Sequence, residues 1–250
     1  MTALPTRKDE AYRYADVAAL ASVWRDLATP ERIEIAAQQK VQQIWLPGAE
    51  PVQVRRVEMI LAEGARASIF ALNTAAQYGR IEIDVHLHEG ADFALYAANI
   101  GGGASNLEIV TTVRHLEPAA TSRQVVRSVL GGKAVGSYLG KVAVARDAQQ
   151  SDSVQSVKAM LLDRGATANA KPELEIYADD VKCAHGATVG ELDPEQLFYA
   201  AARGLDPASA RALLLDGFVS GLWDGIAGDD LGIAELARTA LKAVSAGIGA

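Results

Sequence analysis

The feature that most constrains the fold is a rhythm of short strand-like runs between residues 41 and 182. Runs such as PVQVRRVEMIL, RIEIDVHL and YLGKVAVA are rich in β-branched residues and alternate with polar positions, as half-buried strands do. Turn signals separate the runs in two interleaved series, each repeating at roughly 20 to 30 residues, the spacing typical of solenoids. The first series passes through Glu63-Gly64, Glu89-Gly90, Pro118-Ala119, Asp147-Ala148 and Gly165-Ala166, and the second through Asn73 to Gly79, Gly101 to Ser105 and Gly131 to Gly136. This rhythm predicts a mainly β chain that coils up one sheet and back along another.

A parallel β-helix of this kind stacks each coil on the next, so its first and last coils have open edges. Unpaired edge strands recruit other strands, and we therefore expect these edges to be capped by helices or completed by another subunit. The rival fold is a β-sandwich, which needs antiparallel hairpin turns of the Asn-Gly or Asp-Gly type. None joins these runs, because Asp216-Gly217 and Asp224-Gly225 lie in the C-terminal tail.

We expect three regions along the chain: an N-terminal helical arm over 1–40, a parallel β-helix core over 41–190 and a C-terminal helical region over 191–250. In the arm, apolar and aromatic residues recur at helical spacing from Thr6 to Thr29, and Pro30 ends the pattern. In the tail, Asp193-Pro194 and Asp206-Pro207 each place an N-cap acceptor before a proline at the first helical position.

The helix that starts at Asp206 is expected to carry a broad apolar face, with Leu214, Phe218, Leu222 and Ile226 at four-residue spacing. Glycines at 217, 221 and 225 run beside that face, and each costs about 1 kcal/mol against alanine inside a helix. The expected compensation is a close approach to another helix. A last helix follows, with Asp229 or Asp230 as its cap.

Composition excludes several classes of function. The chain has 250 residues, half of them hydrophobic, and a formal net charge of -7, which argues against a nucleic-acid surface. Its single cysteine excludes an internal disulfide, and no apolar run approaches the roughly 18 residues of a membrane span. The opening MTALPTRKDEAYRYAD lacks the apolar core of a signal peptide. We therefore expect a cytoplasmic protein that binds neither nucleic acid nor membrane.

The chemical interest concentrates in Cys183 and His185, which are two residues apart in the stretch from Lys171 to Gly190. On an extended strand both side chains project from one face and can meet one metal ion or cluster. A closed zinc or iron-sulfur site needs about four ligands, and the other histidines lie far upstream without ligand spacing. Either the remaining ligands come from another chain, or the pair is a buried thiol beside a hydrogen-bonded histidine.

Other chemical signals are weak. The run Gly101-Gly102-Gly103 has no phosphate-loop context, and Gly131-Gly132-Lys133 is followed by alanine where a magnesium-binding hydroxyl is needed. Asp84, His86 and His88 read as a surface row on one strand face. The rival function is a carbohydrate-active β-helix lyase or hydrolase, which needs acids and a base or calcium site aligned on one face. The sequence shows no such register.

The stretch KPELEIYADDVKCAHGATVGELDPEQLFYAAARGL, residues 171–205, closely resembles SufD sequences of the SufB/SufD family of iron-sulfur cluster assembly proteins. Weaker likeness extends back through the strand region to EAYRYADVAAL, where Tyr12 replaces a tryptophan. The resemblance implies a right-handed parallel β-helix with a helical C-terminal region. This chain is shorter than typical SufD sequences, and Ala184 replaces the serine common between the motif's cysteine and histidine.

The resemblance also implies a function. It indicates a non-catalytic scaffold subunit that pairs with SufB through the β-helix and binds the ATPase SufC through its C-terminal helices. Cys183 and His185 become candidates for cluster assembly at the interface and for a partial metal site that a partner chain completes. No cofactor is expected to be held stably by this chain alone, while a nascent iron-sulfur cluster at the SufB interface is compatible with the motif. The expected ATPase contacts are Leu214, Phe218 and Leu222, and self-pairing of the isolated chain stays open.

Overall fold

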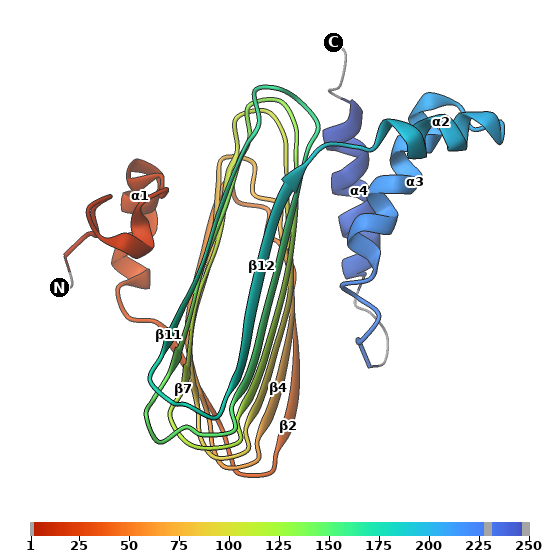
Figure 1. Ribbon diagram of the computed structural model, residues 1–250. Helices are drawn as coiled ribbons and strands as arrows, with labels where there is room; N and C mark the ends of the chain where they lie inside the picture. Colours follow the sequence, from red (N-terminus) through yellow and green to blue (C-terminus); the bar gives the residue numbers. More distant parts are fainter. Residues whose placement is uncertain (1–2, 228–231, 247–250) are drawn as a thin grey trace.

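The computed structural model describes residues 3–227 and 232–246, and its centre is a solenoid of two parallel sheets (Figure 1). Alternate strands belong to opposite sheets, which we call the odd sheet and the even sheet. The odd sheet holds β1 (Glu31–Ile35), β3 (Val52–Leu61), β5 (Tyr78–Leu87), β7 (Asn106–His115), β9 (Val135–Val144) and β11 (Thr167–Ile176). The even sheet holds β2 (Lys40–Trp45), β4 (Arg66–Asn73), β6 (Asp92–Gly101), β8 (Thr121–Leu130), β10 (Asp152–Leu161) and β12 (Lys182–Gly190). The predicted mainly β solenoid is confirmed, with about six turns.

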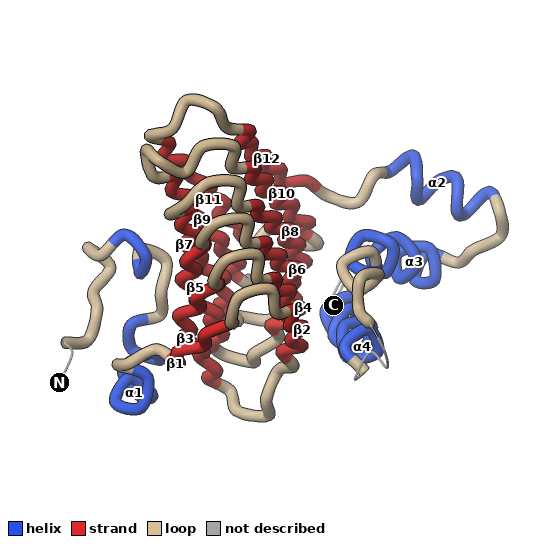
Figure 2. Tube along the Cα trace, turned by 90° about the horizontal axis from the view of Figure 1, so that it is seen from below, coloured by secondary structure: helices blue, strands red, loops and turns tan. Residues whose placement is uncertain are grey.

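Every strand pair in both sheets is parallel, which excludes the antiparallel sandwich. Side chains that point inward alternate with outward ones, and inward residues of both sheets form one apolar core. The first coil, β1 and β2, and the last coil, β11 and β12, lie at opposite ends of the stack (Figure 2).

Stacked turns connect the two sheets and repeat one backbone conformation. At the end where odd strands lead to even strands, a residue with positive φ recurs in each of the first five coils, namely Gln38, Gly64, Gly90, Ala119 and Gln150. Each donates its N–H to the next turn, as Gly64 does to the carbonyl of Glu89 at 2.8 Å. Because glycine adopts this conformation without a steric penalty, the recurring glycines marked these turns in the sequence.

One turn was assigned to the wrong end of the solenoid. Gly165 stacks on the second series, since a Cβ at this position would lie 2.6 Å from the carbonyl oxygen of Gly132. Leu162 likewise donates its N–H to the carbonyl of Leu130 at 2.8 Å. A charged residue before glycine and alanine occurs at both ends, so local sequence cannot separate the two series.

The N-terminal arm lies against the odd sheet (Figure 1). It consists of a short 3-10 helix, η1 (Glu10–Tyr12), and α1 (Val17–Leu27), rather than one continuous helix. The break arises at Asp16, whose side chain caps α1 by accepting the N–H of Ala19.

The C-terminal helices α2 (Pro194–Ala202), α3 (Pro207–Ser220) and α4 (Ile233–Ala246) lie beside the even sheet (Figures 1 and 2). Both predicted caps are confirmed, since Asp193 accepts the N–H of Glu195 and Asp206 accepts those of Ala208 and Ser209. Asp229 and Asp230, the expected caps of the last helix, lie outside the described residues. In the described part of the chain, no helix is both long and apolar enough to cross a membrane.

Two expectations for α3 were wrong. The helix ends at Ser220, with Gly221 as its C-cap, so Leu222 and Ile226 follow it instead of extending its face. The glycines do not mark a helix crossing: among the described residues no atom lies within 4 Å of a Cβ placed on Gly217, and Gly225 approaches Phe70 of β4 at 3.4 Å. Leu222 turns back onto the outer face of the even sheet, where it joins the cluster between sheet and helices.

Candidate functional site

The candidate site lies on the last coil, where β12 forms the edge of the even sheet. Its inner neighbour is β10, and within the described residues no strand pairs with its other side. Almost the whole strand from Lys182 to Gly190 is exposed. The N–H and C=O groups along such an edge are available to a strand of another chain.

Cys183 and His185 lie on this exposed strand and share its inward face. Cys183 is paired in register with Ser153 of β10, and His185 is paired with Gln155 of the same strand. Both of these β10 residues are buried in the interior. Cys183 is half-buried and packs against the core cluster that includes Val142 and Val144, while His185 is exposed. The expectation that both residues project from one strand face agrees with this register, and the corner between them is open to solvent.

The environment of Cys183 favours the protonated thiol. Partial burial, together with the nearby carboxylate of Asp152, raises the pKa of the thiol. A thiol binds metal or attacks sulfur only as a thiolate, so the isolated chain holds this group in its less reactive form. Over residues 3–227 and 232–246 no cluster of three or more His, Cys, Asp or Glu side chains is arranged to hold a metal. Within the described residues, no third donor is therefore arranged beside Cys183 and His185.

A chain of buried polar side chains leads through the interior to this corner. His115 of β7 bonds through Nε2 to the hydroxyl of Ser122 at 2.9 Å, and Ser122 bonds to the hydroxyl of Ser153 at 2.8 Å. Burial lowers the pKa of His115 to about 4, so its imidazole is neutral near neutral pH. Ser153 is the register neighbour of Cys183, so the chain ends one strand below the thiol.

A second interior row leads to His185. Gln124 accepts hydrogen bonds from Thr111 at 2.6 Å and from Tyr138 at 3.1 Å, and Gln155 donates to the hydroxyl of Tyr138 at 3.0 Å. The Oε1 atom of Gln155 is buried without a partner in the described part of the protein. This row ends one strand below His185.

Sequence reasoning missed both polar rows, although a signal for them was present. The motifs Ser122-Arg-Gln, Ser153-Val-Gln and Cys183-Ala-His stand in register on β8, β10 and β12. The Cys-x-His motif is therefore the last of three stacked polar pairs. Aligning the coils on their strands would have revealed the repeat.

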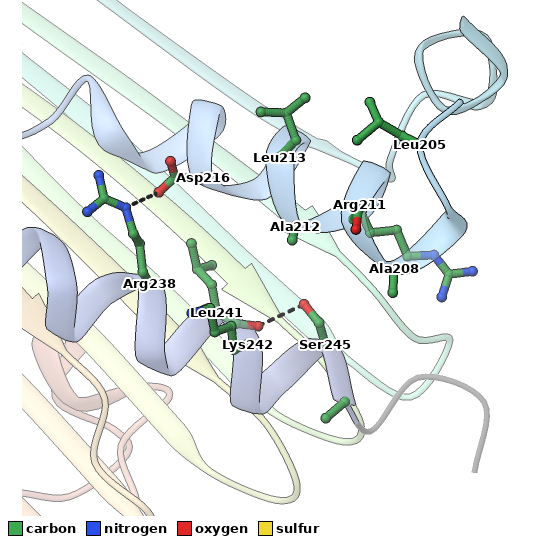
Figure 3. Close-up of a pocket in the computed structure, with 12 residues that line it drawn as sticks. Leu205, Ala208, Arg211, Ala212, Leu213, Asp216, Arg238, Leu241, Lys242 and Ser245 are labelled. Atoms are coloured by element: carbon green, nitrogen blue, oxygen red, sulfur yellow. Dashed lines mark hydrogen bonds and ion pairs between the residues drawn. The ribbon is translucent and has the colours of Figure 1, made fainter. Parts of the chain in front are cut away.

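The tail helices form the other exposed apolar surface. α3 and α4 enclose a cavity of about 780 Å³, which Arg238 of α4 and Asp216 of α3 span with a 3.1 Å ion pair (Figure 3). A smaller groove of about 340 Å³ separates α2 from α3. The most exposed apolar side chains of these helices are Phe198, Tyr199 and Leu213, at 77%, 61% and 58%.

The three expected ATPase contacts occupy different environments. Leu214 is half-buried and lines the groove between α2 and α3. Phe218 is half-buried, with the guanidinium of Arg127 5.9 Å from its ring. Leu222 is only 3% exposed, because it packs against the even sheet.

Comparison with known proteins identifies the family. Residues 32–218 match the family described as "SUF system FeS cluster assembly, SufBD core domain". The iron-sulfur cluster assembly protein SufD of Escherichia coli is 30% identical over 210 residues, covering 82% of this chain and 49% of that protein. A SufBD family protein of Synechocystis is 31% identical over 169 residues, covering 66% of this chain and 37% of that protein.

A third relative, SufD of Plasmodium falciparum, is 27% identical over 153 residues, covering 61% of this chain and 10% of that protein. The chain thus spans about half the length of the Escherichia coli relative and a smaller share of the other two. The family match includes the solenoid from β1 to β12 and continues through most of α3. The chain belongs to the SufBD core family of iron-sulfur cluster assembly proteins.

Proposed function

We propose that this chain is a non-catalytic scaffold subunit that pairs end to end with a SufB-type solenoid. The observation that carries the proposal is the exposed β12 edge, with Cys183 and His185 at its open corner. A partner strand bonded to this edge would bring its own side chains beside these two. The nascent iron-sulfur cluster is then the substrate of the joined pair.

The number of donor side chains supports a cluster site that is shared between this chain and its partner. Two donors are half of the roughly four that a cluster or zinc site uses. A neighbouring iron ion favours the thiolate, so loading would lower the pKa that partial burial raises in the isolated chain. The solenoid would hold Cys183 and His185 at fixed spacing until the partner contributes the rest.

We place the ATPase contact on the outer side of α2 and α3. The exposed Phe198, Tyr199 and Leu213 form an apolar surface beside the groove that Leu214 lines. Exposed clusters of this kind mark protein contacts. We expect Phe218 to lie at the edge of this contact surface. Leu222 is not expected to contact the ATPase, because it is buried.

The rival lyase or hydrolase finds little support in the geometry. The charged residues on the outer face of the odd sheet neutralise one another, as in the bidentate contact of Arg114 with Asp84 at 3.0 and 3.1 Å. His86 lies 3.4 Å from the same carboxylate. A general acid and base must be free to exchange protons with a substrate, whereas these side chains are engaged with one another.

The test is co-expression of the chain with SufB-type and SufC-type subunits. His185→Ala is expected to leave complex assembly intact and to reduce clusters recovered on the complex at least fivefold, read from visible absorbance and iron content. His86→Ala is the matched control, because it removes a partly exposed imidazole from the odd sheet. Equal cluster yield in the two variants would remove His185 from the proposal.

The ATPase contact is tested by replacing an exposed aromatic residue. Phe198→Asp should abolish co-purification with the ATPase while pairing with the SufB-type subunit persists. Leu46→Asp is the control, since Leu46 is an exposed apolar residue at the other end of the molecule, 41% exposed. Retention of the ATPase by Phe198→Asp would exclude the α2 surface.

A further inference from the structure

A cationic cavity lies where α3 crosses the outer face of the even sheet. It has a volume of about 450 Å³, within the range of small-molecule sites. Strands β6 and β8 form its floor, and α3 with the turn after it forms one wall. The lining residues are Tyr96, Arg123, Val125, Arg127, Gly217, Phe218, Gly221 and Leu222.

Arg127 is the central cation of this cavity. Its Nη1 donates to the carbonyls of Val126 at 3.0 Å and Ser156 at 3.1 Å, which fix the guanidinium in place. Within the described chain no carboxylate pairs with it, and partial burial lowers its pKa. Half-buried arginines ordinarily face an anion, and the Nε and Nη2 edge of Arg127 remains for a bidentate oxyanion.

Further positive charge lies near Arg127, while the acids of this sheet face, Asp92 and Asp152, stand in register with Thr121, two residues before Arg123. Arg123 lines the cavity and is exposed, and Lys158 is the register neighbour of Arg127 on β10. No carboxylate is among the lining residues; on the helical side, Asp224 Oδ2 lies 3.9 Å from a Cβ placed on Gly221. This concentration of cations occurs in a chain whose formal net charge is -7.

Gly217 keeps the cavity open. It lies inside α3, where glycine is unfavourable compared with leucine or alanine, and nothing described lies within 4 Å of the Cβ it lacks. Packing within the chain therefore does not account for this glycine. Tyr96, stacked on Phe70 at 5.2 Å between ring centroids, and Phe218 give the cavity rigid aromatic walls.

We propose that this cavity binds a small molecule through a doubly charged oxyanion, a phosphate or a dicarboxylate, with Arg127 and Arg123 as its ligands. The aromatic walls and the space at Gly217 would receive the rest of the molecule. The proposal does not depend on partner pairing or on cluster assembly.

Calorimetric titration of the chain with inorganic phosphate and with succinate, against sodium chloride at equal ionic strength, tests the proposal. One or both oxyanions are expected to bind at one site per chain, and the tighter one identifies the preferred group. The double variant Arg123→Gln with Arg127→Gln should weaken binding at least tenfold. Arg66→Gln, which removes an exposed cation from the same sheet, should leave it unchanged.

Gly217→Leu separates loss of the site from loss of the fold. The variant fills the cavity without changing charge, so it should bind oxyanion at least tenfold more weakly while its thermal midpoint stays level or rises. Binding that Gly217→Leu and the double variant leave intact would overturn the proposal. So would weakening by Arg66→Gln equal to that of the double variant, or binding of an acidic peptide in place of phosphate and succinate.

Discussion

The two ends of the solenoid differ in the charge and exposure of their edge strands. At the first coil, β1 is short and charged, and its Arg32 forms ion pairs with Glu34 and Glu58. Trp45 of β2 is buried there, with the guanidinium of Arg55 4.1 Å from its ring. At the last coil, β12 has nine residues, nearly all of them exposed. Apart from Lys182, this strand contains no lysine, arginine, aspartate or glutamate. The edge of the first coil thus carries charges that disfavour pairing with another strand, whereas the edge of the last coil is exposed and almost uncharged.

The N-terminal arm gives a second contrast with β12, because it is fixed to the odd sheet from β3 as far as β11, where Lys171 pairs with Glu10. Arg80 and Glu108, both with fully buried side chains, pair at 3.1 Å on the outer face of the odd sheet. Arg80 also donates to the carbonyl of Ala11 at 2.8 Å, and Arg56 donates to that of Leu27 at 2.7 Å. Damage to this region should therefore appear in the stability of the isolated chain, and damage to β12 should appear only in partner binding.

The largest effect is expected at Arg80. Arg80→Met removes the cation from the buried carboxylate of Glu108 and leaves it the hydroxyl of Tyr78, which should lower the free energy of unfolding by about 3–5 kcal/mol. Urea unfolding of the isolated chain measures this loss. Arg32→Met, at an exposed ion pair, should change it by less than about 1 kcal/mol. Similar losses in both variants would break the contrast between buried and exposed charges.

A pH effect of about 3 kcal/mol is expected from His115, in the polar chain below the last coil. Its pKa is lowered to about 4 from 6.5, so the unfolded state binds more protons between these values. The contribution of the neutral His115 side chain to the free energy of unfolding is complete above pH 6.5 and declines as the pH falls towards 4. In His115→Gln this part of the slope should vanish. Identical pH profiles for the two proteins would show that His115 titrates normally when folded.

The edge itself is tested by Ala187→Lys on β12. Ala187 is exposed in the isolated chain but shares the inward face with His185, so a lysine there would point into a joined interior. Pairing with the SufB-type subunit should weaken about 100-fold, or about 2.7 kcal/mol, with the unfolding midpoint unchanged. Glu34→Lys, on the edge of the first coil, should pair normally. Equal weakening by both would make the two ends equivalent.

The smallest effect separates two kinds of glycine. Gly217→Ala should raise the free energy of unfolding by about 1 kcal/mol, because alanine favours the helix and open space surrounds the site. Gly132→Ala should lower it, since this turn residue has a φ of 62° and its Cβ would lie 3.0 Å from the backbone of Gly103. Urea unfolding of the two variants measures both changes. A lower free energy of unfolding in Gly217→Ala would show that other atoms pack closely around Gly217.

The sequence predicted the coil rhythm, the helix caps and the Cys-x-His pair because each rests on local patterns. It misplaced the turn at Gly165, since similar turn residues serve both ends. It extended α3 through Ile226, because the four-residue spacing of apolar residues continues past the helix end, where Gly221 is the C-cap. The polar rows below Cys183 and His185 depend on which coil stacks on which, and that register is a property of the folded solenoid.

The central claim is that β12 is an incomplete edge that a second solenoid closes. Hydrogen exchange at the amides of Lys182–Gly190 measures it directly, in the isolated chain and in its complex with the SufB-type subunit. We expect these amides to exchange at least tenfold more slowly in the complex, while the amides of β1 remain unchanged. A stable complex in which β12 exchanges as fast as in the isolated chain would contradict the claim.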